Sequence, residues 1–170
     1  MLRMLSLLAL CCVTLAQAPT STNKPCSAEA FHQFDFWLGD WEVQDPKGQV
    51  VGHNIVASAQ GGCLLTENWV AARGNNTGTS VNFYDARDQK WHQLYFDNTG
   101  DRSNWPELVG EFKEGRMVLL TPPSPSGISR WKWYVLSPDH VRQWAESSTD
   151  GGKTWKTIWD SVYVKTKPQA

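Results

Sequence analysis

Two glutamates, Glu67 and Glu146, are the residues whose type best fits a catalytic acid and base. Cleavage of a glycosidic bond needs two carboxyl groups on opposite sides of a cleft, about 5 to 10 Å apart. The sequence has no G-x-S-x-G nucleophile motif, and its four histidines stand on separate segments without H-x-H or H-E-x-x-H spacing. No catalytic residue, metal ligand or cofactor is therefore predicted. A hydrolase or isomerase acting on a glycan or aromatic compound through the two glutamates is the alternative.

The segment SSTDGGKTW, residues 147–155, has the S-x-D-x-G-x-T-W spacing of an Asp-box, a hairpin motif that is repeated in many sialidases. Its glycines accept positive φ, and the Asp carboxylate can accept N–H groups of its own loop. In sialidases the motif lies away from the catalytic residues and recurs once per propeller blade, whereas it occurs once here. A hairpin with no catalytic role is predicted for the motif residues Ser148, Asp150, Gly152, Thr154 and Trp155.

Turn residues divide most of the chain into ten short segments with the composition of strands. Groups such as DPKG, QGG, NTGD, PPSPSG and TDGG supply Gly, Pro, Asn or Asp at the reversals. The predicted strands are 41–45, 50–58, 63–71, 78–85, 90–97, 106–113, 116–121, 129–136, 140–147 and 155–165. No segment between them is long or periodic enough for a crossover helix. We therefore expect an antiparallel meander, which closes into a barrel because closure removes the unpaired edges.

A short helical pattern precedes the first strand. It begins at residues 27–29, places Phe31, Phe34 and Leu38 on one face, and ends at Gly39. Gly39 lets the chain turn sharply from helix into strand. Trp41 can then lie across the closed end of the barrel, where its indole N–H needs a partner.

Gly39-Asp40-Trp41 has the G-x-W form of the signature found in lipocalins and their calycin relatives. Over residues 27–165, the chain resembles a secreted bacterial family of unknown function that is assigned a lipocalin-like barrel; the segments that carry this resemblance are FHQFDFWLGDWEV, GGCLLTENW, SVNFYD, WHQLYFDNTG, RMVLL and VRQWAESSTDGGKTW. The resemblance implies an all-β, antiparallel up-and-down lipocalin-like β-barrel of eight to ten strands and no established reaction. It also implies a late-strand arginine stacked on Trp41, with Arg142 as the first candidate and Arg130 as the second.

A barrel of this size has room inside for side chains or for one small ligand. Because side chains alternate along a strand, one inward set can combine residues of the third, fourth, fifth and ninth strands. The preferred set is Glu67, Trp69, Asn82, Tyr84, Gln93, Tyr95, Arg142, Trp144 and Glu146. Both faces of several strands carry aromatic residues, so alternation alone leaves the inward face open. An internal Arg142–Glu146 ion pair among space-filling tryptophans is the alternative to a ligand site.

The preferred set is aromatic with a few polar groups, as is usual for small-molecule sites. We therefore expect a non-catalytic binder or carrier of a small, partly apolar ligand. Ten tryptophans also fit stacking on a sugar ring. A structural or partner-binding barrel is a third possibility, and the sequence predicts neither the ligand nor the oligomeric state.

Residues 1–18 have the form of an export signal, with Arg3, an apolar run and Ala16-Gln17-Ala18. The apolar run is too short to cross a bilayer, so no stable membrane insertion is expected. The predicted division is a signal peptide over 1–18, a flexible lead over 19–26, one barrel domain over 27–166 and a tail over 167–170. A formal net charge of −1 without basic clusters argues against nucleic acid as a partner.

Only Cys26 and Cys63 follow the predicted signal, since Cys11 and Cys12 lie within it. A periplasmic or otherwise extracellular compartment favours a disulfide between the two. Closing a loop of this length is worth about 3 to 4 kcal/mol on the chain-entropy view. Two free thiols that never meet are the alternative.

Overall fold

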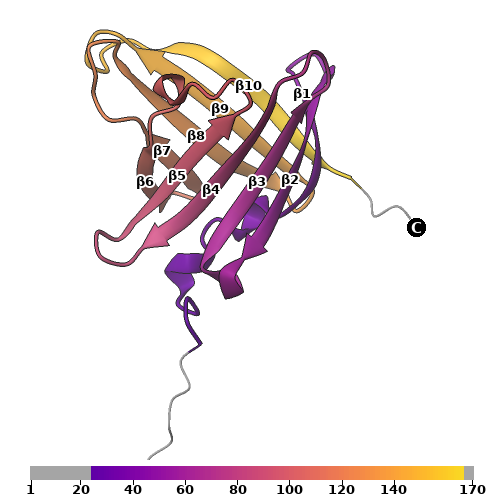
Figure 1. The fold of residues 1–170 in the computed structure, drawn as a ribbon, viewed down its shortest axis with the longest axis vertical. Helices are drawn as coiled ribbons and strands as arrows, with labels where there is room; N and C mark the ends of the chain where they lie inside the picture. The colour runs from indigo at the N-terminus through magenta and orange to yellow at the C-terminus, as the bar shows by residue number, and fades with distance from the viewer. Residues whose placement is uncertain (1–23, 167–170) are drawn as a thin grey trace, which may run out of the picture.

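Ten antiparallel strands form one closed barrel in the computed structural model, which describes residues 24–166 (Figure 1). The strands are β1 (Gly39–Gln44), β2 (Val50–Ala59), β3 (Leu64–Ala71), β4 (Thr77–Asp85), β5 (Lys90–Asp97), β6 (Leu108–Lys113), β7 (Arg116–Leu120), β8 (Ile128–Ser137), β9 (His140–Ser148) and β10 (Lys156–Lys165). Each strand pairs with its neighbours in sequence, and β1 pairs with β10 to close the sheet. The predicted all-β up-and-down barrel is confirmed.

The predicted strand bounds agree with the observed ones to within two residues. The turn residues explain this agreement, because Gly, Pro, Asn and Asp mark the reversals irrespective of which face of a strand is buried. The predicted signal peptide over 1–18, most of the lead over 19–26 and the tail over 167–170 lie outside the described residues. No described helix is long and apolar enough to cross a membrane.

One end of the barrel, called the closed end here, is filled by two 3-10 helices, η1 (Glu29–His32) and η2 (Asp35–Trp37) (Figure 1). Phe34 lies between them with non-helical dihedral angles, which is why the predicted helical segment is two short turns instead of one helix. The rings of Phe34 and Trp37 stack 5.1 Å apart and are fully buried. This segment therefore acts as a plug for the barrel.

The G-x-W segment joins this plug to β1. Gly39 has a φ of +146°, a backbone conformation that residues other than glycine rarely adopt. The Trp41 Nε1 atom donates to the Trp37 carbonyl oxygen at 3.0 Å. Both features agree with the prediction. The cation above the Trp41 ring is Lys165, whose Nζ lies 5.1 Å from the ring centroid. The expectation that Arg142 or Arg130 stacks on Trp41 is wrong, because each of them contacts a different tryptophan.

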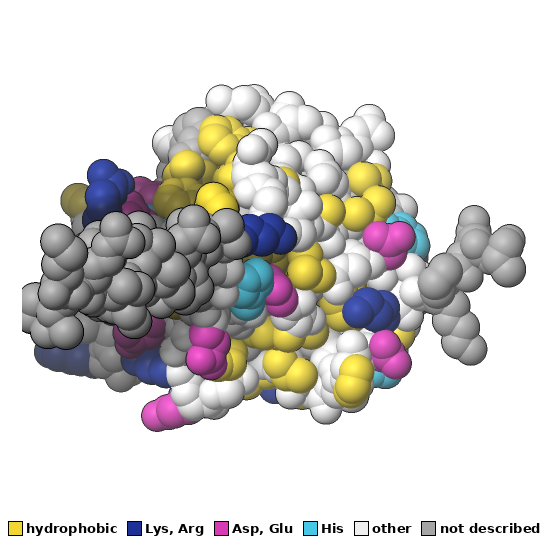
Figure 2. All heavy atoms as spheres, turned by 90° about the horizontal axis from the view of Figure 1, so that it is seen from below, with side chains coloured by type: hydrophobic (Ala, Val, Ile, Leu, Met, Phe, Trp, Pro, Cys, Tyr) yellow, Lys and Arg dark blue, Asp and Glu magenta, His cyan; other side chains and the backbone are white. Residues whose placement is uncertain are grey.

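A disulfide between Cys26 and Cys63 is present, with the two Cα atoms 5.1 Å apart. It ties the segment before η1 to the residue after η3 (Gln60–Gly62), so it anchors the plug to the β2–β3 connection. The predicted bond is confirmed. When the molecule is viewed from this end, basic, acidic and apolar side chains of the described residues are interspersed on the visible surface (Figure 2).

The opposite end, called the open end here, is formed by the other set of strand connections. These connections are residues 45–49, 72–76, 98–107 with η4 (Arg102–Asn104), 121–127 and 149–155. No segment of the described chain enters the barrel from this side as η1 and η2 do from the other (Figure 1). The closed barrel with one plugged end is compatible with a lipocalin-like fold.

Candidate functional site

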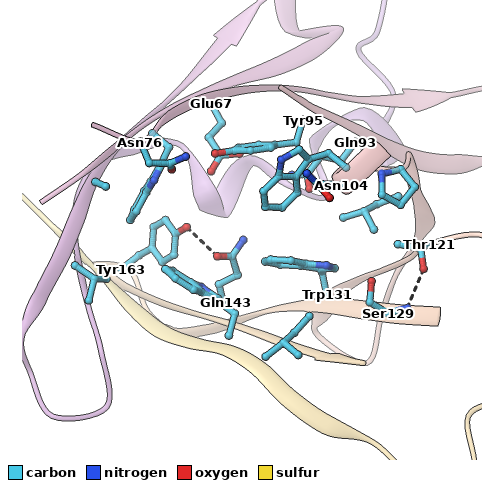
Figure 3. Close-up of a pocket in the computed structure, with 18 residues that line it drawn as sticks. Glu67, Asn76, Gln93, Tyr95, Asn104, Thr121, Ser129, Trp131, Gln143 and Tyr163 are labelled. Atoms are coloured by element: carbon cyan, nitrogen blue, oxygen red, sulfur yellow. Dashed lines mark hydrogen bonds between the residues drawn. The ribbon is translucent and has the colours of Figure 1, made fainter. Parts of the chain in front are cut away.

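The interior of the barrel is hollow toward the open end. The cavity has a volume of about 640 Å³, within the range of roughly 300 to 1,000 Å³ that is typical of small-molecule sites. Six aromatic residues line it: Trp69, Tyr95, Trp105, Trp131, Trp159 and Tyr163. Its polar lining residues are Glu67, Asn76, Gln93, Asn104, Thr121, Ser129 and Gln143. Side chains from opposite walls of the barrel face one another across this space (Figure 3).

A chain of hydrogen bonds runs along the wall of β2, β3, β4 and β5. Gln93 Nε2 donates to Asn82 Oδ1 at 2.8 Å, and Asn82 Nδ2 donates to Ser80 Oγ at 2.9 Å. Ser80 Oγ donates to Glu67 Oε2 at 2.6 Å, and Asn54 Nδ2 donates to Glu67 Oε1 at 2.8 Å. The chain thus ends on both oxygens of the Glu67 carboxyl group, which is the shared acceptor of the network.

Two further side chains continue this network to the other wall. Asn54 Nδ2 also approaches Tyr163 Oη at 3.4 Å, and Tyr163 Oη donates to Gln143 Oε1 at 3.0 Å (Figure 3). The network therefore links β5 through Glu67 to β10 and β9. Buried polar groups that are joined in this way hold one another in place, which keeps the lining of the cavity rigid.

Glu67 is buried, with 5 % of its surface exposed, and forms no ion pair with any described side chain. Burial raises the pKa of its carboxyl group, and the hydrogen bonds from Ser80 and Asn54 offset part of that effect. Burial and then the charge of Glu67 raise the pKa values of Tyr95 and Tyr163 in turn. This part of the cavity therefore disfavours additional negative charge.

Two glycines make room for the aromatic lining. A Cβ atom at Gly52 would overlap the Trp69 ring, and one at Gly78 would overlap the Tyr95 hydroxyl group. Gly52 lies on β2 and Gly78 on β4, the strands that flank β3. Because these positions lack side chains, the two rings lie against the wall, and the centre of the barrel stays open.

Four residues of the predicted inward set line the cavity: Glu67, Trp69, Gln93 and Tyr95. Asn82 is fully buried, and its Oδ1 atom accepts a hydrogen bond from the lining residue Gln93. Tyr84 lies nearer the closed end, where its ring is 5.2 Å from that of Phe31. The structure brings these predicted residues of β3, β4 and β5 together on the inner face.

The three predicted residues of β9 lie on the opposite face from the lining residue Gln143. Arg142 forms two hydrogen bonds of 2.8 Å with Asp160. Glu146 is paired with Lys132 at 2.6 Å and with Arg130 at 2.8 Å, and Trp144 lies under Lys132 with the Nζ atom 4.1 Å from its ring centroid. The expected inward placement of these residues is therefore wrong, and there is no internal Arg142–Glu146 pair.

The preferred inward set missed the lining that the last three strands supply, which includes Trp131, Gln143, Ile158, Trp159 and Tyr163. One signal was available, because Val141 and Ala145 flank Gln143 at alternate positions and are both buried. Their small apolar side chains favour that face of β9 as the inner one. The loop residues Asn104 to Pro106 gave no such signal, since loops lack a periodic pattern.

The proposed catalytic pair is not assembled in the cavity. Glu67 lines it, whereas Glu146 lies on the other face of β9 among cations. Burial of Glu146 opposes its ionisation, but hydrogen bonds from Lys132 and Arg130 outweigh that effect and lower its pKa. Glu146 is thus held as a carboxylate by its neighbours on the outer surface, so the hydrolase alternative loses its second carboxyl group.

The Asp-box hairpin joins β9 to β10 at the open end. The Asp150 carboxylate accepts the Thr154 hydroxyl at 2.7 Å and the backbone N–H groups of Lys153 and Thr154 at 3.0 and 2.9 Å. These bonds, the Thr154 hydroxyl first, lower the pKa of Asp150 to about 2. Gly152 has positive φ, and its carbonyl oxygen accepts the Trp155 indole N–H at 2.9 Å. The motif forms the predicted turn.

One further cluster lies outside the cavity. Ligand atoms of Asp85, Asp88 and His92 lie within 4.8 Å of one another. Asp85 is engaged by the Arg87 guanidinium, and the two ring nitrogens of His92 contact Asp88 and Glu107 at 3.0 and 2.8 Å. The side chains of this cluster are therefore already engaged by neighbouring residues.

No protein-family model matches this chain, and no curated protein is similar enough to count as a relative. The residues that carry the resemblance to lipocalin-like proteins, Gly39 and Trp41 among them, occupy structural positions at the closed end.

Proposed function

We propose that this chain is an exported, non-catalytic binding protein that holds or carries a small, partly apolar ligand inside its barrel. The observation that carries the proposal is the cavity of about 640 Å³ at the open end. Aromatic rings on its walls supply apolar contact, and a connected set of polar side chains supplies points that orient a ligand. Glu67 and Gln93 are held in place by hydrogen bonds from or to buried side chains behind the lining, which fixes the points that would orient a ligand.

Export is part of the proposal. The sequence pattern of residues 1–18 supports it, as does the disulfide between Cys26 and Cys63, because such bonds persist in oxidising compartments. We also propose membership of the secreted bacterial lipocalin-like family that the chain resembles. The closed up-and-down topology and the place of Gly39 and Trp41 at the start of β1 support that membership.

A ligand screen tests the binding function. Fluorescence of the cavity tryptophans and isothermal calorimetry are followed while lipids, aromatic compounds, isoprenoids and sugars are added to the folded protein. Ala71→Trp places a large ring in the cavity, whereas Val70→Trp places it on the exposed outer face of the same strand. We expect bound ligands to be lost from the first variant and retained by the second.

The screen is complemented by native mass spectrometry of protein purified from its own host. A co-purifying small molecule that Ala71→Trp excludes and Val70→Trp keeps would support the proposal. A screen without any binding, together with a ligand-free native protein, would contradict it.

A further inference from the structure

We propose that the ligand of this cavity presents a positively charged group, a protonated or quaternary amine, to Glu67. The inference rests on the proposed binding function and adds the charge of the ligand to it. It places the cationic group beside the carboxyl oxygens, with the apolar remainder of the ligand among the aromatic rings toward the open end.

The charges of the lining residues favour a cationic ligand. Glu67 is the one carboxyl group among the described lining residues, and none of them is Lys, Arg or His. No described cation forms an ion pair with it. A buried carboxylate without a counter-ion is costly, because the interior solvates charge poorly. A cation on the ligand would supply the missing partner, and no described lining residue would compete with it.

The hydrogen bonds that Glu67 accepts leave its carboxyl group able to bind a further donor. Ser80 Oγ already accepts a hydrogen from Asn82 Nδ2, so its own hydrogen is available to Glu67. The amide nitrogen of Asn54 donates to the other carboxyl oxygen. Two donors from opposite sides thus meet one acceptor; they favour the ionised form, against burial, which raises the pKa of the carboxyl group overall. A cation beside Glu67 would add to the effect of these donors and favour the carboxylate. A carboxylate has about four lone-pair sites, so it keeps capacity for a further donor from a ligand.

The aromatic rings near Glu67 also favour a cation. Tyr163 Oη lies 3.4 Å from the same Asn54 nitrogen that bonds Glu67, so this ring stands beside the carboxyl group. Trp69 belongs to the same face of β3, and its ring meets that of Trp159 edge to face at 6.0 Å. Aromatic faces attract cations, more strongly where water is excluded. Carboxyl group and rings thus favour the same sign of charge.

This arrangement discriminates against anionic ligands. A fatty acid would bring its carboxylate toward Glu67 with no described cation in the lining to neutralise it. Burial and the charge of Glu67 already raise the pKa values of Tyr95 and Tyr163, so the cavity resists a second negative charge. A neutral ligand of the same shape would gain the apolar contacts but not the charge pair.

Three probes with the same chain separate these cases: octylamine, 1-octanol and octanoate. Binding to the whole folded protein is measured at pH 7 by calorimetry. Since a hydrogen bond to a charged group contributes about 1.5 to 3 kcal/mol, we expect octylamine to bind at least about tenfold more tightly than 1-octanol. Octanoate is expected to bind more weakly than either.

Glu67→Gln is the informative variant, and Glu42→Gln on β1 is its matched control, since Glu42 does not line the cavity. The first should reduce the preference for octylamine over 1-octanol to less than about twofold to threefold, while the second should leave it unchanged. Octyltrimethylammonium, which has charge but no N–H donor, should show the same dependence on Glu67. Circular dichroism checks that both variants fold.

The probe series on the unmodified protein also tests the charge assignment without any variant. If 1-octanol or octanoate binds as tightly as octylamine, or if Glu67→Gln keeps the preference, the charge assignment is wrong and the binding function stands. If none of the probes binds and the wider screen is also negative, both proposals fail.

Discussion

The two ends of the barrel are both rich in aromatic residues, yet one is filled and the other is hollow. At the closed end, Phe34 contacts three other rings directly, and five rings are almost completely buried in one core cluster: Phe34, Trp37, Trp41, Trp91 and Trp133. At the open end, rings of similar size line the cavity. The abundance of aromatic residues therefore does not decide whether an end of this barrel is filled or hollow; the difference lies in the segment that enters the interior at the closed end.

The plug makes this difference. Phe34 enters the barrel from the turn between η1 and η2, and its ring meets those of Trp91 and Trp133 edge to face at 5.6 and 5.2 Å. At the open end, Gly52 and Gly78 let rings lie against the wall. The disulfide holds the plug in place, so the closed end provides stability while the open end leaves space.

The largest expected effect tests that division directly. Trp37→Ala removes a fully buried ring from the plug and should lower the free energy of unfolding by about 3 to 5 kcal/mol. Trp105→Ala removes a ring that borders open space and should cost less than Trp37→Ala, even though it also removes the hydrogen bond from Trp105 Nε1 to Asp97. Urea unfolding followed by circular dichroism measures both. Equal losses would mean that the two ends do not differ in packing.

A smaller effect is expected at the wall of the cavity. Gly78→Ala adds a methyl group where the Tyr95 hydroxyl lies, so the ring must move toward the cavity. Such overpacking costs about 1 to 3 kcal/mol, and we expect ligand binding to weaken with it. The control Thr79→Val changes the next residue, which is exposed on the outer face. Calorimetry that finds the two variants equal in binding would contradict the role given to Gly78.

The smallest effect is a difference in pH dependence between two carboxyl groups. The folded-state pKa of Glu67 lies above its usual value of 4.5, so its contribution to stability is complete below that pH and is lost as pH rises through the folded-state pKa. Glu67→Gln removes this dependence. Above pH 4.5, the stability of the unmodified protein should therefore fall relative to the variant, by at most about 1.4 kcal/mol per pH unit.

For Asp150, in the hairpin at the open end, the expected pH dependence of stability has the opposite sign. Its pKa is lowered from 3.8 to about 2, so its contribution is present above pH 3.8 and is lost as pH falls through 2. Asp150→Asn should therefore differ from the unmodified protein mainly at neutral pH, with a difference that fades in acid. Thermal melts of both variants from pH 2 to 8 measure the two slopes; slopes of the same sign would contradict the assignment.

Local features of the chain determined most of the fold. Gly, Pro, Asn and Asp mark the turns through their own backbone preferences, which is why ten strands were predicted with nearly correct bounds. The Asp-box hairpin follows from bonds within residues 148–155, and the pairing of Cys26 with Cys63 follows from there being two cysteines after the predicted signal. Each of these needs only neighbours in sequence or a single choice of partner.

The tertiary structure decided which faces of the strands enclose the cavity. On β9 the larger side chains, Trp144 and Glu146, lie on the outer face, where Lys132 and Arg130 from the neighbouring strand cover them. Alternation fixes that Gln143 and Trp144 point in opposite directions, and it leaves open which of them points inward. Closure of the barrel settles this, since each side chain lies inside or outside only relative to strands that are far apart in sequence.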